Sequence, residues 1–177
     1  EEGAGAEIAS GGELYLALKF GYLRNKITFT GVGKTDEEIE YALRENIFNF
    51  TVESLQEIHV ISGIAHRLGV IARISIRVNP DIDAKTHPYI TTGMKENKFG
   101  IDSKDIMDVF KTASELPNID LIGIHSHIGS QITEVNPYIE AVKYLGELIE
   151  KVEKMGINIR YINFGGGFGV QYKNILT

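Results

Sequence analysis

The sequence contains no cysteine, no apolar run long enough to cross a membrane and no excess of basic residues. Without cysteine the chain has no disulfide framework and no thiolate nucleophile. A membrane-spanning helix needs about 20 apolar residues. The net charge of −6 argues against a nucleic-acid or anionic-membrane partner. The acidic, glycine-rich start "EEGAGAEIAS" is unlike a secretory signal, so we expect a cytoplasmic protein.

The chain has 177 residues, which is long enough for one domain with a sizeable core. The first residue is not methionine, so we expect the chain to be a piece of a longer protein.

Segments typical of strands alternate with segments typical of helices along the chain. Such repeated βα units predict a parallel sheet. Ser54 followed by Glu57 predicts a capping box at one helix start. The expected strands are 6–10, 26–31, 47–52, 70–80, 119–130 and 158–164, and the expected helices are 12–21, 36–46, 54–69, 102–116 and 137–156.

The side-chain pattern within two strands favours a closed barrel over an open sheet. Ser75 and Arg77 fall on one face of their strand, and Gly123, His125 and His127 fall on one face of another. Strands with one polar face suit a (β/α)8 barrel of the TIM type, whereas open doubly wound sheets have strands that are apolar on both faces. An antiparallel sheet with a wetted face is the alternative. Six strands predict six of the eight βα units.

Three adjacent glycines, Gly165 to Gly167, follow the last expected strand in "YINFGGGFGV". Glycines let several backbone N–H groups converge on an anion, and barrel enzymes often bind phosphate after a late strand. We expect Gly166 to adopt a φ value that only glycine tolerates. The segment predicts a phosphate site, and a tight turn without a ligand is the alternative.

The segment 125–131, "HSHIGSQ", places two histidines at the carboxyl end of an expected strand. Both could face one zinc ion, although no third ligand is evident. "TGVGKT" (30–35) lacks the first glycine of a phosphate-binding P-loop, so an ATPase is not supported. The long insert at 80–101 predicts a functional loop.

Taken in order, "TTGMKENKFGI" (91–101), "HSHIGSQI" (125–132) and "GGGFGV" (165–170) resemble the diaminopimelate decarboxylase family. This family belongs to the alanine-racemase-like, fold-type III group of pyridoxal 5'-phosphate (PLP) enzymes. "ASGGELYLALKFGY" (9–22) and "IRVNPDID" (76–83) are also similar, so the resemblance covers essentially the whole chain.

The resemblance implies roles for residues that bind the cofactor. His127 is expected to stack on the pyridine ring, Ser130 and Gly165, Gly166 and Gly167 to hold the phosphate, and Arg77 to lie beneath the cofactor. The implied reaction is decarboxylation of meso-2,6-diaminopimelate to L-lysine by a homodimer with a shared active site. Arginine and carboxynorspermidine decarboxylases of the same fold, and a non-catalytic PLP-binding barrel, are the alternatives.

The resemblance also implies that no catalytic residue lies within this chain. The Schiff-base lysine is expected upstream of Glu1, and Lys19, Lys34 and Lys98 match other positions of the family. The glutamate that binds the pyridine nitrogen and a C-terminal β domain are expected beyond Thr177. Residues 1–177 are therefore interpreted as a partial PLP-binding barrel domain, from the second to the seventh strand, that is inactive alone.

Overall fold

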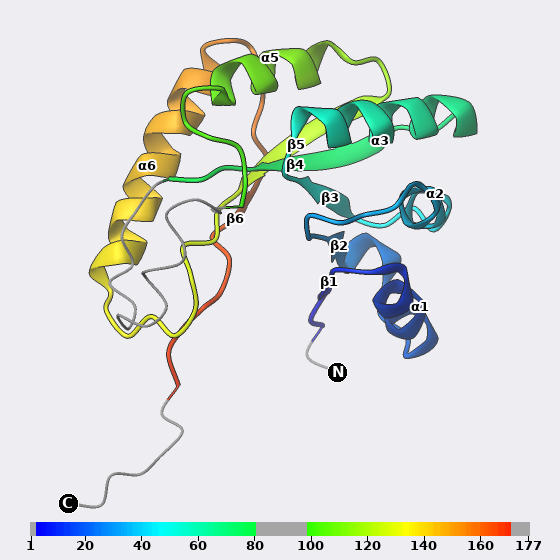
Figure 1. Cartoon of the computed structure of the whole chain (residues 1–177), viewed down its shortest axis with the longest axis horizontal. Helices are drawn as coiled ribbons and strands as arrows, with labels where there is room; N and C mark the ends of the chain where they lie inside the picture. Colours follow the sequence, from blue (N-terminus) through cyan, green and yellow to red (C-terminus); the bar gives the residue numbers. More distant parts are fainter. Residues whose placement is uncertain (1–2, 81–98, 171–177) are drawn as a thin grey trace, which may run out of the picture.

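The structure, a computed structural model, describes residues 3–80 and 99–170. Within these ranges six strands form one sheet, and every neighbouring pair is parallel (Figure 1). This confirms the parallel βα arrangement. The strands run in sequence order and comprise β1 (Ala6–Ile8), β2 (Ile27–Phe29), β3 (Asn49–Val52), β4 (Ala72–Arg77), β5 (Ile119–His125) and β6 (Tyr161–Asn163).

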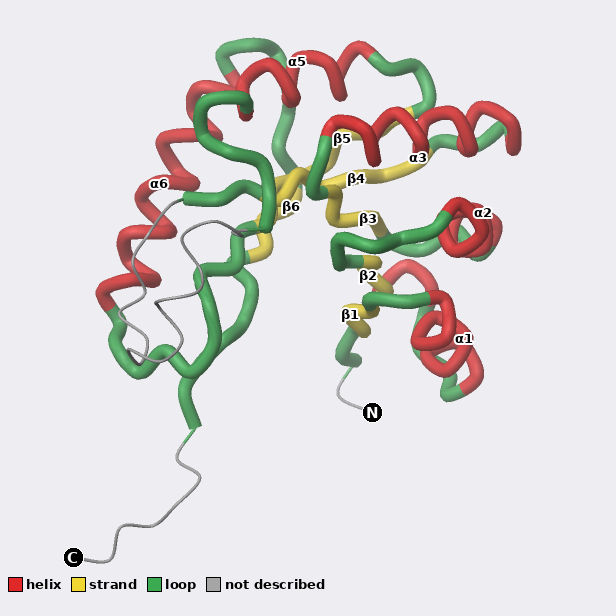
Figure 2. Tube along the Cα trace, in the orientation of Figure 1, coloured by secondary structure: helices red, strands yellow, loops and turns green. Residues whose placement is uncertain are grey.

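The described helices lie along the outer side of the sheet, as Figure 2 shows with strands in yellow and helices in red. The expected elements all occur, with shorter strands than the sequence suggested. None of the described helices is long and apolar enough to cross a membrane. The helices are α1 (Gly11–Lys19), α2 (Asp36–Arg44), α3 (Leu55–Leu68), α5 (Ile106–Glu115) and α6 (Asn136–Glu153), with a 3-10 turn at Arg24–Lys26.

The sheet curls strongly, so that its first and last strands approach each other on the inner side. Asn163 Nδ2 of β6 donates to Glu7 Oε2 of β1 across 3.4 Å. The rings of Phe48, just before β3, and Tyr161 of β6 also meet edge to face, 5.1 Å between centroids. The six strands therefore form a half-barrel, as the alternation of polar and apolar residues predicted.

The two faces of the sheet differ in polarity as expected. Phe50 and Ile74 are paired neighbours and are buried in the hydrophobic core together with Phe29, Ile76 and Ile124. The opposite, concave face carries polar side chains that bond one another. Asn49 Nδ2 donates to Ser75 Oγ at 2.8 Å, and the Thr51 and Ser75 hydroxyls lie 3.2 Å apart.

A β-bulge interrupts the alternation in β5. Ile74 pairs with Leu121, whereas Ser75 pairs with Gly123, so Ile122 is the extra residue. The simple alternation placed Ile122 on the same face as Ile124. Leu121 joins the hydrophobic core instead, and the bulge restores the expected phase from Gly123 onward.

The capping box predicted at Ser54 and Glu57 is only half correct. Ser54 Oγ accepts from the Glu57 N–H at 3.1 Å, but the Glu57 carboxylate accepts from the Glu53 N–H and not from that of Ser54. A complete capping box occurs one helix earlier, where Thr35 and Glu38 at the start of α2 bond reciprocally.

We expect Thr35→Ala to lower the free energy of unfolding by about 1 kcal/mol, because an N-cap hydroxyl satisfies an otherwise unpaired N–H group. Urea denaturation measures this effect. Thr112→Ala is the control, since the Thr112 hydroxyl donates only to the carbonyl of Asp108 within α5. Equal losses from both substitutions would contradict the assignment of the cap.

Candidate active site

The carboxyl ends of β4, β5 and β6 bring several of the predicted residues to one edge of the half-barrel. Parallel strands end at the same edge, and barrel active sites lie there. The loop after β5 is attached to the end of β6, because the Ser126 N–H donates to the Asn163 carbonyl at 2.9 Å. Asn163 Oδ1 in turn accepts from the Gly165 N–H at 2.8 Å.

Two of the three adjacent glycines are required by close backbone contact between these loops. Gly165 and Gly167 have φ values of +70° and +87°. A Cβ atom on Gly167 would lie 1.8 Å from the Gly129 carbonyl oxygen, and one on Gly165 would lie 2.8 Å from the Ser126 carbonyl oxygen. The segment 165–167 therefore lies directly against the segment 126–130.

Gly166 differs from its neighbours. A Cβ atom added there would meet no atom within 4 Å, and its φ lies outside the left-handed region. The expectation of a glycine-only φ at Gly166 is therefore wrong, since the positive values fall on the flanking glycines. Its carbonyl accepts from the Tyr138 hydroxyl at 3.1 Å. The N–H groups of Gly166 and Gly167 have no acceptor among the described residues.

His127 and Ser130 lie in the loop after β5, because the strand ends at His125. The expected strand over 119–130 is thus too long, and the backbone leaves the sheet at Ser126. His127 is half-buried and Ser130 is exposed. Partial burial lowers the pKa of His127, the nearby Arg77 charge lowers it further, and Glu7 opposes both.

His125 is buried at the end of β5, with 3% of its surface exposed. Burial lowers its pKa to about 3, with further contributions from the charges of Arg77 and His127, so the ring is neutral at pH 7. Its Nδ1 and the Ser126 hydroxyl have no hydrogen-bond partner within the described part of the chain. Two buried polar groups at this edge therefore lack a partner among the described residues.

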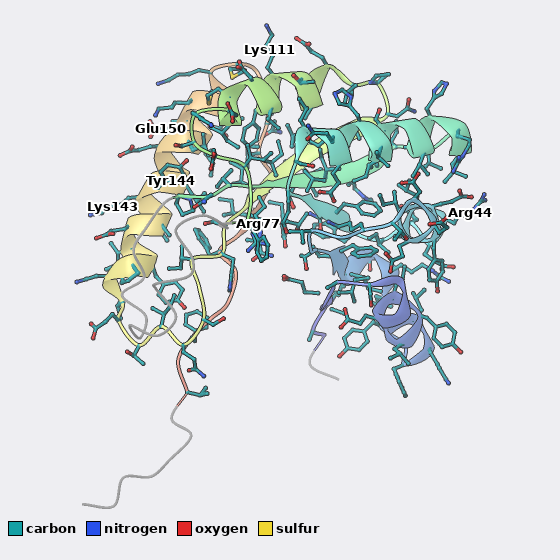
Figure 3. All side chains as sticks on the ribbon, viewed as in Figure 1. Arg44, Arg77, Lys111, Lys143, Tyr144 and Glu150 are labelled. Carbon is teal, nitrogen blue, oxygen red and sulfur yellow. The ribbon has the colours of Figure 1, made fainter. Side chains whose placement is uncertain are left out.

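Arg77 ends β4 and points toward the concave side of the half-barrel, whereas Lys111, Lys143 and Glu150 lie on the outside (Figure 3). Its Nη1 donates to Glu53 Oε1 at 2.8 Å, and its guanidinium lies 5.4 Å from the centre of the Phe99 ring. Both partners of the ion pair are largely buried, with 12% and 5% of their side chains exposed.

Glu53 and Glu7 also contact residues of the candidate active site, although the sequence patterns above do not single them out. Glu53 directly follows β3, and Glu7 lies in β1 on the concave side. The rule that acidic residues at strand ends reach the active-site edge could have found Glu53. Glu53 Oε2 has no partner among the described residues, so this buried carboxylate is only half satisfied.

The other predicted residues do not join this edge. No group of three potential ligands for a metal ion occurs among residues 3–80 and 99–170, so His125 and His127 have no third ligand for zinc there. Lys19 is in the last turn of α1, near the Tyr15 ring. Lys98 and most of the insert 80–101 lie outside the described residues.

A comparison with protein families matches residues 1–176 to the pyridoxal-dependent decarboxylase family, pyridoxal binding domain. Among curated proteins, the chain is 51% identical over 173 residues to a diaminopimelate decarboxylase of Aquifex aeolicus and 47% identical over 171 residues to one of Helicobacter pylori. These matches cover 98% and 97% of this chain, but only 41% and 42% of the relatives.

The chain also matches solved structures of decarboxylases. Diaminopimelate decarboxylase of Helicobacter pylori complexed with L-lysine superposes with a TM-score of 0.90 at 46% identity, covering 96% of this chain and 43% of that one. A lysine/ornithine decarboxylase of Vibrio vulnificus reaches a TM-score of 0.78 at 27% identity, over 97% of this chain and 42% of that one. The chain therefore spans less than half the length of these relatives.

Proposed function

Because the chain belongs to the pyridoxal-dependent decarboxylase family, we propose that it forms part of an enzyme that decarboxylates meso-2,6-diaminopimelate to L-lysine with PLP. The observation that carries this choice is the difference in identity among relatives of one fold. The chain is 51% identical to a diaminopimelate decarboxylase but 27% identical to a lysine/ornithine decarboxylase.

The geometry of the candidate active site fits a phosphate-bearing cofactor. The space around Gly166 is open, and the N–H groups of Gly166 and Gly167 lack acceptors among the described residues. A phosphate group needs several such donors, and glycine permits its close approach.

In the proposed enzyme, Gly165, Gly166, Gly167 and Ser130 hold the phosphate of PLP, and His127 lies on the cofactor ring. Partial burial lowers the pKa of His127, which favours the neutral form of its imidazole. Arg77 lies beneath the cofactor and orients it. The buried Glu53 carboxylate holds the Arg77 guanidinium in a single orientation.

When bound, PLP supplies an electron sink for the electron pair left by the departing CO2. The residues of this chain bind and orient, and none of them acts as the covalent lysine in our proposal. That lysine, the glutamate for the pyridine nitrogen and the β domain belong to the rest of the proposed protein. Residues 1–177 supply a partial PLP-binding domain of a cytoplasmic homodimer.

The decisive experiment incubates the purified full-length protein with PLP and meso-2,6-diaminopimelate and measures CO2 and L-lysine. L-arginine and carboxynorspermidine are tested as alternative substrates in separate, parallel reactions. We expect stoichiometric release of CO2 and L-lysine from diaminopimelate alone. Preferential turnover of L-arginine would select the arginine-decarboxylase alternative, and PLP binding without any turnover would select a non-catalytic barrel.

We expect His127→Ala in the full-length protein to weaken PLP binding roughly fivefold, because aromatic stacking contributes on the order of 1 kcal/mol. Turnover should also fall. Absorbance titration with PLP measures the affinity. His59→Ala is the control, since His59 is exposed on α3, away from the strand ends. Equal losses in both variants would disprove the stacking role.

A further inference from the structure

Lys34, in the segment that imperfectly matches a P-loop, is a buried ammonium group. Only 1% of its side chain is exposed. Its Nζ donates to the Gly31 carbonyl at 2.6 Å, to the Thr51 carbonyl at 2.8 Å and to Glu57 Oε1 at 2.6 Å. Three donors meet three acceptors, so the ammonium is fully satisfied. Lys34 therefore joins the loop before α2 to the end of β3 and the start of α3.

Glu57 uses its two carboxylate oxygens for two different partners. Oε1 accepts from Lys34, and Oε2 accepts from the Glu53 N–H at 2.8 Å. The Glu57 N–H itself is held by Ser54 Oγ. The turn from β3 into α3, residues 53–54, is thus attached to the Lys34 ammonium through one side chain.

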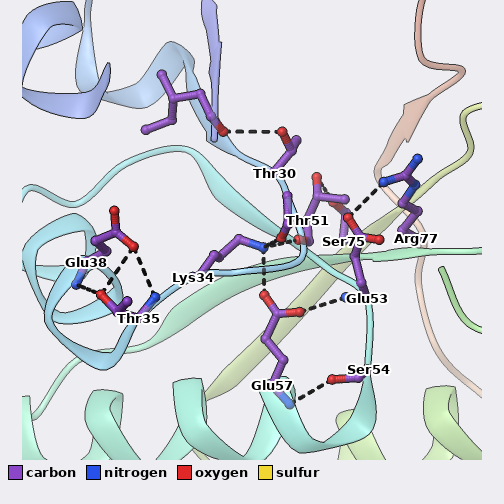
Figure 4. Close-up of polar contacts among 12 residues, drawn as sticks. Thr30, Lys34, Thr35, Glu38, Thr51, Glu53, Ser54, Glu57, Ser75 and Arg77 are labelled. Atoms are coloured by element: carbon purple, nitrogen blue, oxygen red, sulfur yellow. Dashed lines mark hydrogen bonds and ion pairs between the residues drawn. The ribbon is translucent and has the colours of Figure 1, made fainter. Parts of the chain in front are cut away.

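The next contact leads to the candidate active site. Glu53, whose backbone is held by Glu57, accepts from Arg77 through its own side chain at 2.8 Å. Figure 4 shows the resulting order of contacts, from Lys34 to Glu57, then to the Glu53 backbone, and from the Glu53 carboxylate to Arg77. The contacts run from Lys34, in the loop after β2, past the end of β3 to Arg77 at the end of β4.

We propose that Lys34 and Glu57 are positioning residues that fix Arg77 through Glu53 and thereby raise the affinity of the full-length protein for PLP. The cofactor part of this inference rests on the proposed function. Lys34 and Glu57 need not touch PLP for this role. Their ion pair sets where the Glu53 backbone lies, and the Glu53 carboxylate then sets where the guanidinium lies.

Stability alone does not account for an ion pair at this place. Removing two charges from water is costly, and a well-packed apolar pair of similar volume stabilises a protein about as well. An apolar pair cannot accept a hydrogen bond from the Glu53 N–H, however. The directional contact, and not the burial, is what Glu57 adds to the turn at 53–54.

The test is a double variant, Lys34→Met with Glu57→Met, in the full-length protein. The matched control is Arg160→Met with Asp120→Met. These substitutions remove an exposed ion pair of 2.7 Å at the amino ends of β5 and β6, away from the candidate active site. We measure thermal unfolding, the Kd for PLP and the Arg77–Glu53 distance in crystals of the cofactor-free variants. Glu57→Leu, which also removes the acceptor for the Glu53 N–H, replaces the double variant if that variant does not fold.

We expect the double variant to remain folded but to melt below wild type, because the Gly31 and Thr51 carbonyls and the Glu53 N–H lose their partners. We also expect it to bind PLP roughly tenfold more weakly, as when a group that orients a ligand-binding residue is lost, and to lose the Arg77–Glu53 contact. The control should change none of these. Wild-type PLP affinity in a folded double variant, or an unchanged Arg77–Glu53 contact, would overturn the proposal. A wild-type protein that binds no PLP refutes the proposed function instead, and the crystallographic distance still decides the positioning role.

Discussion

Gly166→Val in the full-length protein is expected to weaken PLP binding on the order of a hundredfold while leaving thermal unfolding nearly unchanged. The branched side chain would occupy the open space in front of the loop, where no atom lies within 4 Å of an added Cβ. Excluding the phosphate from two N–H donors removes two hydrogen bonds to a charged group, each contributing about 1.5 kcal/mol. Absorbance titration with PLP gives the affinity, and calorimetry gives the melting temperature.

Gly167→Ala is the comparison, because even one methyl group at this neighbouring residue is expected to destabilise the fold. Its φ of +87° disfavours any side chain, and the added Cβ would lie 1.8 Å from the Gly129 carbonyl oxygen. We expect a loss of about 2 kcal/mol or more in the free energy of unfolding.

The two glycine variants together separate a cofactor role from a folding role. Gly166→Val with wild-type PLP affinity would remove Gly166 from the proposed phosphate site. Gly166→Val with a melting temperature as low as that of Gly167→Ala would indicate that the open space is filled in the complete protein. Neither result would contradict the assignment of the half-barrel fold.

The architecture could be predicted from the sequence because it depends on regular patterns. Alternation of polar and apolar residues correctly assigned Ser75 and Arg77 to the concave face. The same rule failed at Ile122, where a bulge adds one residue, since no single-residue pattern marks a bulge. It also failed at His127, because the rule does not indicate where the backbone leaves the sheet.

The polar contacts around the site could not be predicted, since they join residues far apart in the chain. A local rule predicts that Glu57 completes a capping box with Ser54. Its carboxylate bonds Lys34 instead, 23 residues away, at 2.6 Å. The sequence contains both residues but gives no sign that a parallel sheet brings them together.

His125 makes the stability of the half-barrel sensitive to acid. Its pKa is lowered to about 3 in the folded chain, chiefly by burial, whereas an unfolded histidine has a pKa of about 6.5. Arg77 from β4 faces it as the paired residue of the sheet, Asn163 pairs with it from β6, and His127 follows it in the chain. The two positive or protonatable neighbours make a proton on His125 still less favourable.

The sign of the effect follows from these two pKa values. Protonation of His125 favours the unfolded chain. The contribution of the neutral ring to the free energy of unfolding is therefore fully present above about pH 6.5. It is lost as the pH falls toward 3, by about 1.4 kcal/mol per pH unit. We expect urea denaturation of the cofactor-free full-length protein to show this slope between pH 6 and 4 in excess of that of His125→Asn. His59→Asn should keep the wild-type slope, because His59 is exposed. If His125→Asn and wild type lose stability equally over this range, His125 is not buried as a neutral ring.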